Sequence, residues 1–329
     1  MAEAAANGEL DQARQAQLAE ALAMCCAGDV DGGLARYRRL LNGHAAQHLA
    51  PVGIHAHVLE ARGLVSLADT LRRVGIRAGA DLCVAGTMGL PQRAVDEYRG
   101  LFDRGLINSH MVVNFLRRLD ELGQTEELRT RLDAARLTRT VALSDGGRWS
   151  DIRDLLLSGQ VSLKWQEAVQ SARKMGIAVG LQSHRHPLIR DLMGDMGREI
   201  ESYLDAWRCS GHWIAPRLPR RPVLSAWANL SYGEGYSVPH FHPRGWATAV
   251  CFITAPAQER TDAATPGALR IGPPPGAQNP LAWPDVTIPA KPGVLVLMPS
   301  YLTHWANPLA EPGLRISITM DANEEAAGA

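Results

Sequence analysis

The sequence predicts an α+β protein in which a helical N-terminal half precedes an antiparallel β sandwich or barrel. Up to residue 137, apolar residues recur at three- and four-residue steps and the segments end at glycines, as in amphipathic helices. After about Val223 the segments are short and β-branched, and most of the 20 prolines lie beyond residue 215. Because these prolines disfavour long helices, an antiparallel sheet is expected there. A chain of 329 residues also exceeds the usual ~100–200 residues of one domain, so two domains are expected.

The helices of the first half are expected to follow one another closely. The segments that indicate them are residues 10–28, 31–41, 64–75, 91–105, 107–123 and 124–137. Asp29 or Asp31 can cap the second helix, and Pro91 suits a first helical turn. Short helices joined by glycine-bearing turns favour stacked helix pairs. Residues 27–41 and 119–137 resemble tetratricopeptide repeats, although no steady period of about 34 residues is present.

The helical half has two interpretations. Tetratricopeptide-like stacking implies a surface that holds a substrate or partner, whereas a plain helical bundle would serve as a structural cap or a dimer interface. We expect this domain to span residues 1–137. The second domain would span 138–329, with a helical lead-in over 138–215 and a β core over 216–329. In the lead-in, residues 187–207 carry a helical apolar stripe that should pack on the β core; its members are Leu188, Leu192, Met196, Ile200 and Leu204.

Composition places limits on the partners. Apolar residues make up 46% and charged residues 21% of the chain, as in soluble globular proteins. The 34 basic and 34 acidic residues balance, so neither nucleic acid nor an anionic membrane is an expected partner. No apolar run reaches the ~18–20 residues that span a bilayer. The N-terminus lacks a secretory signal, and the five cysteines show no CxxC spacing, so a cytoplasmic protein with reduced thiols is expected.

Three histidines of the β half have the spacing of a metal chelate. His240 and His242 stand two residues apart, and residues i and i+2 of a strand point to the same side. His304, on a later strand, can complete a facial set that leaves coordination positions open for substrates. Imidazole suits iron, zinc and copper alike, so the ligand type does not select the metal. No further catalytic residue beyond these ligands is expected.

Two other HxH pairs are weaker candidates. His55 and His57, and likewise His184 and His186, lie in or beside helical segments, where residues i and i+2 do not face the same way. Exposed or hydrogen-bonded histidines are the expected reading of both pairs.

Residues 221–320 resemble 2-oxoglutarate/Fe(II)-dependent oxygenases of the double-stranded β-helix, or jelly-roll, fold. The similarity lies in three blocks: Trp227 to Asn229 followed by His240, His242 and Pro243; Pro292 to Ser300 running into His304; and Arg315 with Ser317. The resemblance implies Fe(II) and 2-oxoglutarate as cofactors, with O2 as co-substrate. It also implies that Arg315 and Ser317 bind the C5 carboxylate of 2-oxoglutarate. A planar guanidinium can receive a carboxylate in two parallel hydrogen bonds, and the alternative role of Arg315 is a structural ion pair.

The sequence departs from the common family pattern at one ligand. The family usually supplies a carboxylate (HxD or HxE) where this chain has His242. Either the site uses three histidines, or His242 lies outside the ligand set and another group or water completes it. Glu234 and Asp262 are the nearest carboxylates, and neither has the spacing of a facial triad. We favour His242 as a ligand.

Several polar and aromatic residues are secondary candidates. Tyr232 and Thr248 are predicted to contact the co-substrate, and Tyr236, Trp246 and Asn229 the primary substrate. Packing within the barrel is the alternative for Tyr232, Tyr236, Trp246 and Thr248.

The predicted function is an oxygenase, most simply a hydroxylase or desaturase of an amino-acid residue, a peptide or protein, or a small metabolite. A carrier-tethered residue is a further possible substrate, and the chain could form a homodimer. Two alternatives remain: a three-histidine dioxygenase that does not use 2-oxoglutarate, and a scaffold that binds metal or 2-oxoglutarate without catalysis. Arg315 and Ser317 argue against the first, because such an enzyme needs no buried receptor for a carboxylate.

Overall fold

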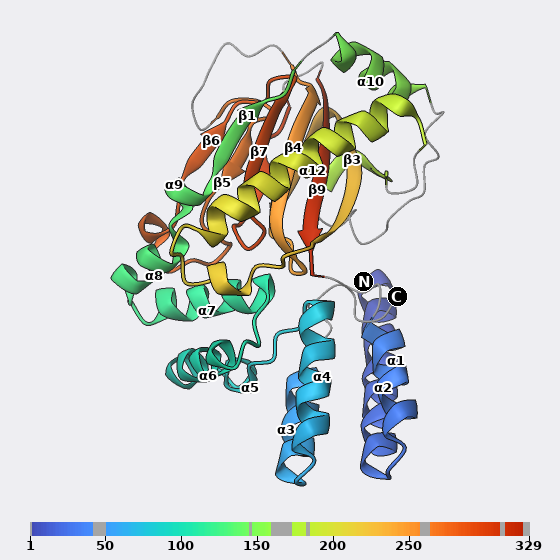
Figure 1. The fold of residues 1–329 in the computed structure, drawn as a ribbon, viewed down its shortest axis with the longest axis vertical. Coiled ribbons are helices and arrows are strands. Elements are labelled where there is room, and N and C mark those ends of the chain that lie inside the picture. Colours follow the sequence, from blue (N-terminus) through green and yellow to red (C-terminus); the bar gives the residue numbers. More distant parts are fainter. Residues whose placement is uncertain are drawn as a thin grey trace. The chain divides into compact units, whose positions relative to one another are not determined.

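The computed structural model describes residues 2–41, 51–144, 147–158, 173–181, 185–256, 264–309 and 313–324. They belong to two compact units, Met1–Arg118 and Leu119–Ala329, whose elements are labelled in Figure 1. The sequence suggested a boundary at residue 137. The structure differs because the helices that follow Leu119 lie in the same unit as the β-sheet.

The first unit consists of helices, as the apolar periodicity predicts. They are α1 (Ala2–Cys26), α2 (Val30–Leu41), α3 (Pro51–Ala61), α4 (Val65–Ala78), α5 (Val84–Thr87), α6 (Pro91–Asp103) and most of α7 (Ser109–Glu121). Neighbours in sequence pack as pairs: α1 with α2, α3 with α4, and α5 with α6. Tetratricopeptide-like character stays a prediction.

Local chemistry sets two of these helix ends. The Oδ1 atom of Asp29 accepts the backbone N–H of Gly32 at 3.0 Å, which caps α2 as expected. Helix α4 was expected to end at Gly75 but continues to Ala78, and Gly79 with φ of 80° closes it. Gly75 instead permits close packing, because a Cβ atom there would lie 2.8 Å from Cγ1 of Val52.

The second unit is built around one curled, mostly antiparallel sheet, which confirms the predicted α+β class and the double-stranded β-helix architecture (Figure 1). Its strands are β1 (Arg139–Ala142), β2 (Arg173–Gly180), β3 (Val223–His240), β4 (Gly245–Thr254), β5 (Leu269–Ile271), β6 (Val286–Ile288), β7 (Val294–Pro299), β8 (His304–Ala306) and β9 (Leu314–Asn323). The order is β1-β7-β4-β9-β3-β8-β5-β6, and β2 also pairs with β3. Strands β1 and β2 come from the lead-in, where the sequence indicated only a helix.

Strand β3 belongs to both halves of the curled sheet. Residues 223–232 pair with β9, whereas Ser237 and His240 pair with β8. A register shift lies between Ser237 and His240. Such irregularities bend a strand and increase its twist, so β3 can pass from one half of the sheet to the other.

Helices α10 (Arg148–Leu157) and α12 (Pro187–Arg208) cover the outer face of the sheet at β4, and α12 also contacts β7 (Figure 1). The predicted apolar stripe of α12 is confirmed from Leu192 onward, but its first buried member is Ile189 rather than Leu188. Gly197 allows close approach to the sheet, since a Cβ atom there would meet Cδ1 of Leu224 at 3.2 Å. The remaining helices of this unit are α8 (Thr125–Leu132), α9 (Ala134–Leu137), η2 (Ala215–Arg217) and η3 (Pro280–Ala282).

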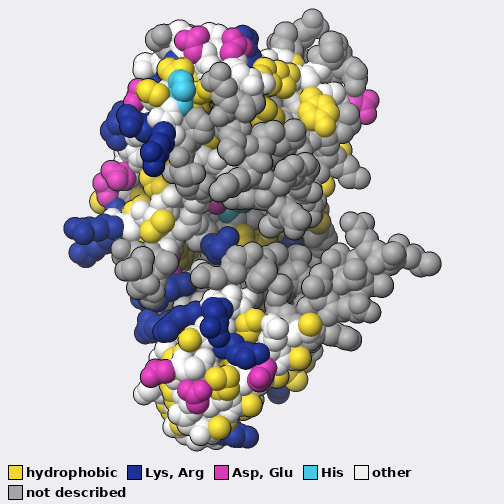
Figure 2. Space-filling view, turned by 90° about the vertical axis from the view of Figure 1, so that its right-hand side faces the viewer, with side chains coloured by type: hydrophobic (Ala, Val, Ile, Leu, Met, Phe, Trp, Pro, Cys, Tyr) yellow, Lys and Arg dark blue, Asp and Glu magenta, His cyan; other side chains and the backbone are white. Residues whose placement is uncertain are grey.

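The surface carries charges of both signs. Figure 2 shows basic and acidic side chains on the same face, with hydrophobic side chains among them. Over the ranges of the chain that the structure describes, no helix is both long and apolar enough to cross a membrane.

We predict that Ile200→Ala lowers the stability of the second unit by about 2–5 kcal/mol, because the removed atoms leave a cavity between α12 and the sheet. Ile200 is fully buried, whereas its neighbour Glu201 is exposed. Thermal unfolding followed by circular dichroism measures the loss, and Glu201→Ala is the control. Equal melting temperatures for Ile200→Ala and the unaltered protein would contradict this packing.

Candidate metal centre

The backbone brings the three predicted histidines together from two separate segments. His240 is the last residue of β3 and lies opposite His304, the first residue of β8. His242 lies beyond the end of β3, and its backbone N–H donates to the carbonyl oxygen of Ser300 at 2.9 Å. The sequence argument placed His240 and His242 on one strand. In the structure His242 lies past the end of β3, just before the turn at residues 243–244, so strand alternation does not account for its position beside the other two.

The three rings form a compact cluster. The ring centroids lie 4.5 Å apart for His240 and His304, 4.9 Å for His242 and His304, and 5.4 Å for His240 and His242. One nitrogen from each ring lies within 4.8 Å of the others, which is close enough for a shared ion. The donor set of three imidazoles therefore fits a divalent transition metal.

In all three histidines the ring nitrogen that faces a hydrogen-bond acceptor is Nδ1. Nδ1 of His240 lies 2.8 Å from the carbonyl oxygen of Val238, and Nδ1 of His304 lies 2.9 Å from that of Leu302. A carbonyl oxygen can only accept, so Nδ1 carries the proton in both rings. His242 follows the same pattern with a carboxylate, because its Nδ1 atom lies 2.7 Å and 2.9 Å from the two oxygens of Asp321. In the neutral form, Nε2 of each ring then carries the lone pair that a metal needs.

Arg315 lines the same cavity as the histidines. Its side chain is buried, and burial lowers the pKa of the guanidinium to about 10, so it keeps its charge at neutral pH. It donates one hydrogen bond, from Nη1 to the carbonyl oxygen of Gly267 at 3.1 Å, while Nε is buried without a partner. No carboxylate of the described part of the chain forms an ion pair with it, so the alternative role of Arg315 in a structural ion pair finds no support there. A buried cation without a counter-ion is costly, and an anionic ligand would offset that cost.

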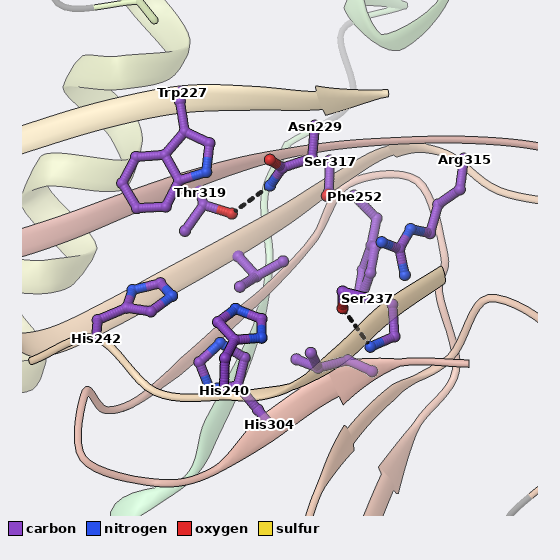
Figure 3. A pocket seen from close by; sticks show the side chains of 13 residues that line it. Trp227, Asn229, Ser237, His240, His242, Phe252, His304, Arg315, Ser317 and Thr319 are labelled. Atoms are coloured by element: carbon purple, nitrogen blue, oxygen red, sulfur yellow. Dashed lines mark hydrogen bonds between the residues drawn. The ribbon is translucent and has the colours of Figure 1, made fainter. Parts of the chain in front are cut away.

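The cavity encloses about 410 Å³ of space when its open mouth is included. Figure 3 shows the histidines on one side and Arg315 on the other. Polar residues from the inner faces of β3 and β9 lie between them, together with an apolar wall. The lining residues are Trp227, Asn229, Ser237, His240, His242, Val250, Phe252, Leu269, His304, Ala306, Arg315, Ser317 and Thr319.

Two lining residues present unsatisfied polar atoms. The amide nitrogen of Asn229 donates to Oγ1 of Thr319 at 2.9 Å, but Oδ1 of Asn229 is buried without a partner. Nε1 of Trp227 is likewise buried without a partner, and its ring lies 5.5 Å from that of His242. Buried polar atoms of this kind are usually satisfied by water or by a ligand.

The secondary candidates fall in different places. Asn229 and Ser317 line the cavity. Tyr232 does not, because it is out of phase with Asn229 along β3 and its side chain is 49% exposed. Tyr236 is half-buried and Trp246 is buried, and neither lines the cavity.

Thr248 also lies outside the cavity lining, although it was predicted to contact the co-substrate. It is fully buried, and its hydroxyl contacts Asp321 and Ser300, both at 2.8 Å. Its contacts are therefore with the residues behind His242.

Those other candidate ligands that the structure describes are not part of the cluster. His55 is half-buried in α3 and lies 2.7 Å from the hydroxyl of Tyr37, while burial lowers its pKa. Within the residues that the structure describes, only His240, His242 and His304 group closely enough to hold a metal. Glu234 is exposed. His184 and Asp262 lie outside the described residues.

The sequence argument missed Asp321, Trp227 and Thr319 as members of the site. A usable signal was present, because Arg315, Ser317, Thr319 and Asp321 follow one another at period two on β9. Extending that alternation past Ser317 would have placed Thr319 and Asp321 on the face of Arg315.

Comparison with known proteins identifies one family. A family described as "Putative 2OG-Fe(II) oxygenase" matches residues 225–321, which include the three histidines and Arg315. No curated protein matches the chain significantly.

Several solved structures are similar in part. A prolyl-4-hydroxylase from Pseudomonas putida shares 14% identity with a TM-score of 0.42, over 57% of this chain and 93% of that one. A prolyl hydroxylase from Trichoplax adhaerens, in complex with a hypoxia inducible factor peptide fragment, shares 13% identity with a TM-score of 0.42, over 62% and 92%. The epimerase SnoN from nogalamycin biosynthesis, in complex with Fe3+ and alpha ketoglutarate, shares 14% with a TM-score of 0.34, over 62% and 87%. At these scores the likenesses carry no conclusion about substrate.

We predict that His240→Ala and His304→Ala each weaken Fe(II) binding by more than about 100-fold, because the loss of a ligand should exceed the 10–100-fold cost of losing a residue that supports one. His242→Ala should also weaken binding. Anaerobic equilibrium dialysis measures the effect. His57→Ala is the control, because His57 is an exposed histidine outside the cluster. Full-strength iron binding by either of the first two variants would refute the metal centre.

Proposed function

We propose that this chain, whose residues 225–321 belong to the 2OG-Fe(II) oxygenase family, hydroxylates an amino-acid residue within a peptide or protein. Oxygenases of this family use Fe(II), 2-oxoglutarate and O2. The observation that carries the proposal is the buried guanidinium of Arg315, without a carboxylate partner among the described residues, in the cavity that three histidines line.

The residues present fit both cofactors. His240, His242 and His304 would hold Fe(II) through Nε2, since their Nδ1 atoms face acceptors. Arg315 would receive the C5 carboxylate of 2-oxoglutarate, and Ser317, two residues away on the same face of β9, can donate to the same carboxylate. When bound, these cofactors supply the oxidation, in which decarboxylation of 2-oxoglutarate to succinate is coupled to oxidation of a C–H bond.

Other lining residues would orient the substrate and limit water. Val250, Phe252 and Leu269 form an apolar wall that restricts solvent in the cavity. Nε1 of Trp227 can donate, and Oδ1 of Asn229 can accept, one hydrogen bond each from a bound molecule. Because Trp227 lies beside His242, we assign it to the primary substrate; Asn229 keeps its predicted substrate role.

The arrangement of helices in the first unit favours a polypeptide as the substrate. Its helices pack as successive pairs, and stacked helix pairs form extended surfaces suited to peptides. A small metabolite is the alternative, with the helical unit then acting as a lid or a dimer interface. A carrier-tethered residue, a homodimer and a cytoplasmic location stay predictions.

We predict that Arg315→Leu raises the 2-oxoglutarate requirement tens- to thousands-fold while changing Fe(II) affinity little. Removing one partner of a buried charged pair costs about 2–5 kcal/mol. Anaerobic titration of the iron-loaded protein with 2-oxoglutarate, followed by visible charge-transfer absorption, measures the change.

Arg315→Lys is the matched variant, because it keeps the charge but loses the two-pronged donor, and it should show an intermediate requirement. Succinate release by the unaltered protein tests use of 2-oxoglutarate directly. If the 2-oxoglutarate titration of Arg315→Leu equals that of the unaltered protein, Arg315 does not bind the carboxylate. If, in addition, the unaltered protein releases no succinate, a three-histidine dioxygenase that does not use 2-oxoglutarate is favoured.

We also predict that peptides, more than free amino acids, stimulate succinate release, and that removal of residues 1–107 abolishes this stimulation. The cut keeps α7 whole together with Asn108, whose Oδ1 atom accepts the backbone N–H of Met111 at 2.9 Å. Succinate release in the absence of a peptide should persist in the shortened protein.

The separate 1–107 fragment provides a second measurement, because it should compete for the stimulating peptide. Equal stimulation of the shortened and the full chain would exclude a substrate-holding role for the helices.

A further inference from the structure

Asp321 is a buried carboxylate that contacts the histidine cluster from behind. The residue is 7% exposed, and both of its carboxylate oxygens lie within 2.9 Å of Nδ1 of His242. It does not line the cavity, and it does not group with the three histidines as a candidate ligand. Its contact with the site therefore runs through His242.

A chain of hydroxyl groups converges on the same carboxylate. Oγ1 of Thr248 donates to Oδ1 of Asp321 at 2.8 Å. Since a hydroxyl has one proton, the 2.8 Å contact between Thr248 and Ser300 must have Ser300 as donor. The direction of donation is thus Ser300 to Thr248 to Asp321. His242 also donates to Asp321, and its Nδ1 atom lies 3.1 Å from Oγ1 of Thr248.

Three strands of the sheet position this network. Thr248 on β4 lies directly opposite Asp321 on β9, and Ser300 follows the end of β7. Gly245 leaves the necessary space, because a Cβ atom there would lie 2.6 Å from Oγ of Ser300. Side chains held by neighbouring strands are restricted to one arrangement, as expected of groups that orient a ligand.

The histidine cluster itself carries no negative charge, and the network behind it contains a carboxylate. Three neutral imidazoles bring no negative charge to a metal, whereas facial triads of Fe(II) oxygenases include a carboxylate. In this chain a carboxylate lies one hydrogen bond away from the metal-facing ring. A histidine that donates to a carboxylate is a more basic ligand, and its ring orientation is fixed.

We propose that Asp321 is a positioning residue of the metal centre, which holds His242 with Nε2 toward the metal and supplies negative charge to the site through that ring. This inference rests on the metal site of the proposed function. It also assigns His242 to the ligand set, where the sequence left two possibilities.

The test uses the full chain with Co(II), a probe that avoids oxidation. Asp321→Asn keeps the size of the side chain and an oxygen that can accept from Nδ1, but it removes the charge. We expect it to raise the Co(II) dissociation constant 10- to 100-fold, the usual effect of losing a residue that supports a metal ligand. In the iron-loaded protein the Fe(III)/Fe(II) midpoint potential should rise, because loss of negative charge destabilises Fe(III) more than Fe(II).

Two further variants separate positioning from general destabilisation. Asp195→Asn removes another partly buried carboxylate, one paired with Arg148 on the outer side of the sheet, and should leave both measurements unchanged. In a His242→Ala background, Asp321→Asn should have no further effect on Co(II) binding, since its only route to the metal has been removed.

The outcomes distinguish the inference from the function on which it rests. Absence of Co(II) binding by the unaltered protein would overturn both. Normal binding and potential in Asp321→Asn, or an undiminished effect in the His242→Ala background, would overturn the role of Asp321 alone.

Discussion

The pairing of β3 first with β9 and then with β8 is the constraint on which the site depends. Along its first half β3 lies against β9, so that Trp227 faces Thr319 and Asn229 faces Ser317. After the register shift it lies against β8, which sets His240 opposite His304. One strand thus connects the polar inner face of β9 to the histidine cluster. A change in the register of β3 would separate the two, because a shift of one residue reverses the face to which each side chain points.

The cavity between these strands contains polar groups that no residue in the described ranges satisfies. Nε of Arg315, Oδ1 of Asn229 and Nε1 of Trp227 are buried without partners, and each such group costs about 1–3 kcal/mol. The structure tolerates them because β3 and β9 are held on both sides by neighbouring strands. Ligands that satisfy these groups should therefore stabilise the fold as they bind, since binding to the folded state alone shifts the unfolding equilibrium. Stability and ligand binding are coupled in this unit through the same three atoms.

Short-range patterns in the sequence predicted much of this site, whereas contacts between residues far apart in the sequence were missed. The HxH pair, His304 and the lone arginine in an apolar strand are local features, and all four side chains line the cavity. The contact between His242 and Asp321 joins residues 79 apart in sequence, and it depends on a strand order that no local pattern encodes. Tyr232 and Thr248 were placed at the cavity because they lie close to the histidine motif in sequence. Tyr232 does not line it, because it is out of phase with Asn229 along β3. Thr248 does not line it either, because its hydroxyl contacts Asp321 and Ser300.

The position of the carboxylate bears on a difference between this site and the HxD pattern of the family that residues 225–321 resemble. In the common arrangement the carboxylate is itself a ligand, and its charge and its position are inseparable. In the arrangement that we propose the two functions are divided: His242 would provide the metal-facing atom, and Asp321, 2.7 Å from its Nδ1 atom, would provide the charge. The division requires a buried and fully hydrogen-bonded carboxylate, which the hydroxyls behind it and the space at Gly245 make possible. The pairing of β4 with β9, which sets Thr248 opposite Asp321, therefore holds the carboxylate behind His242.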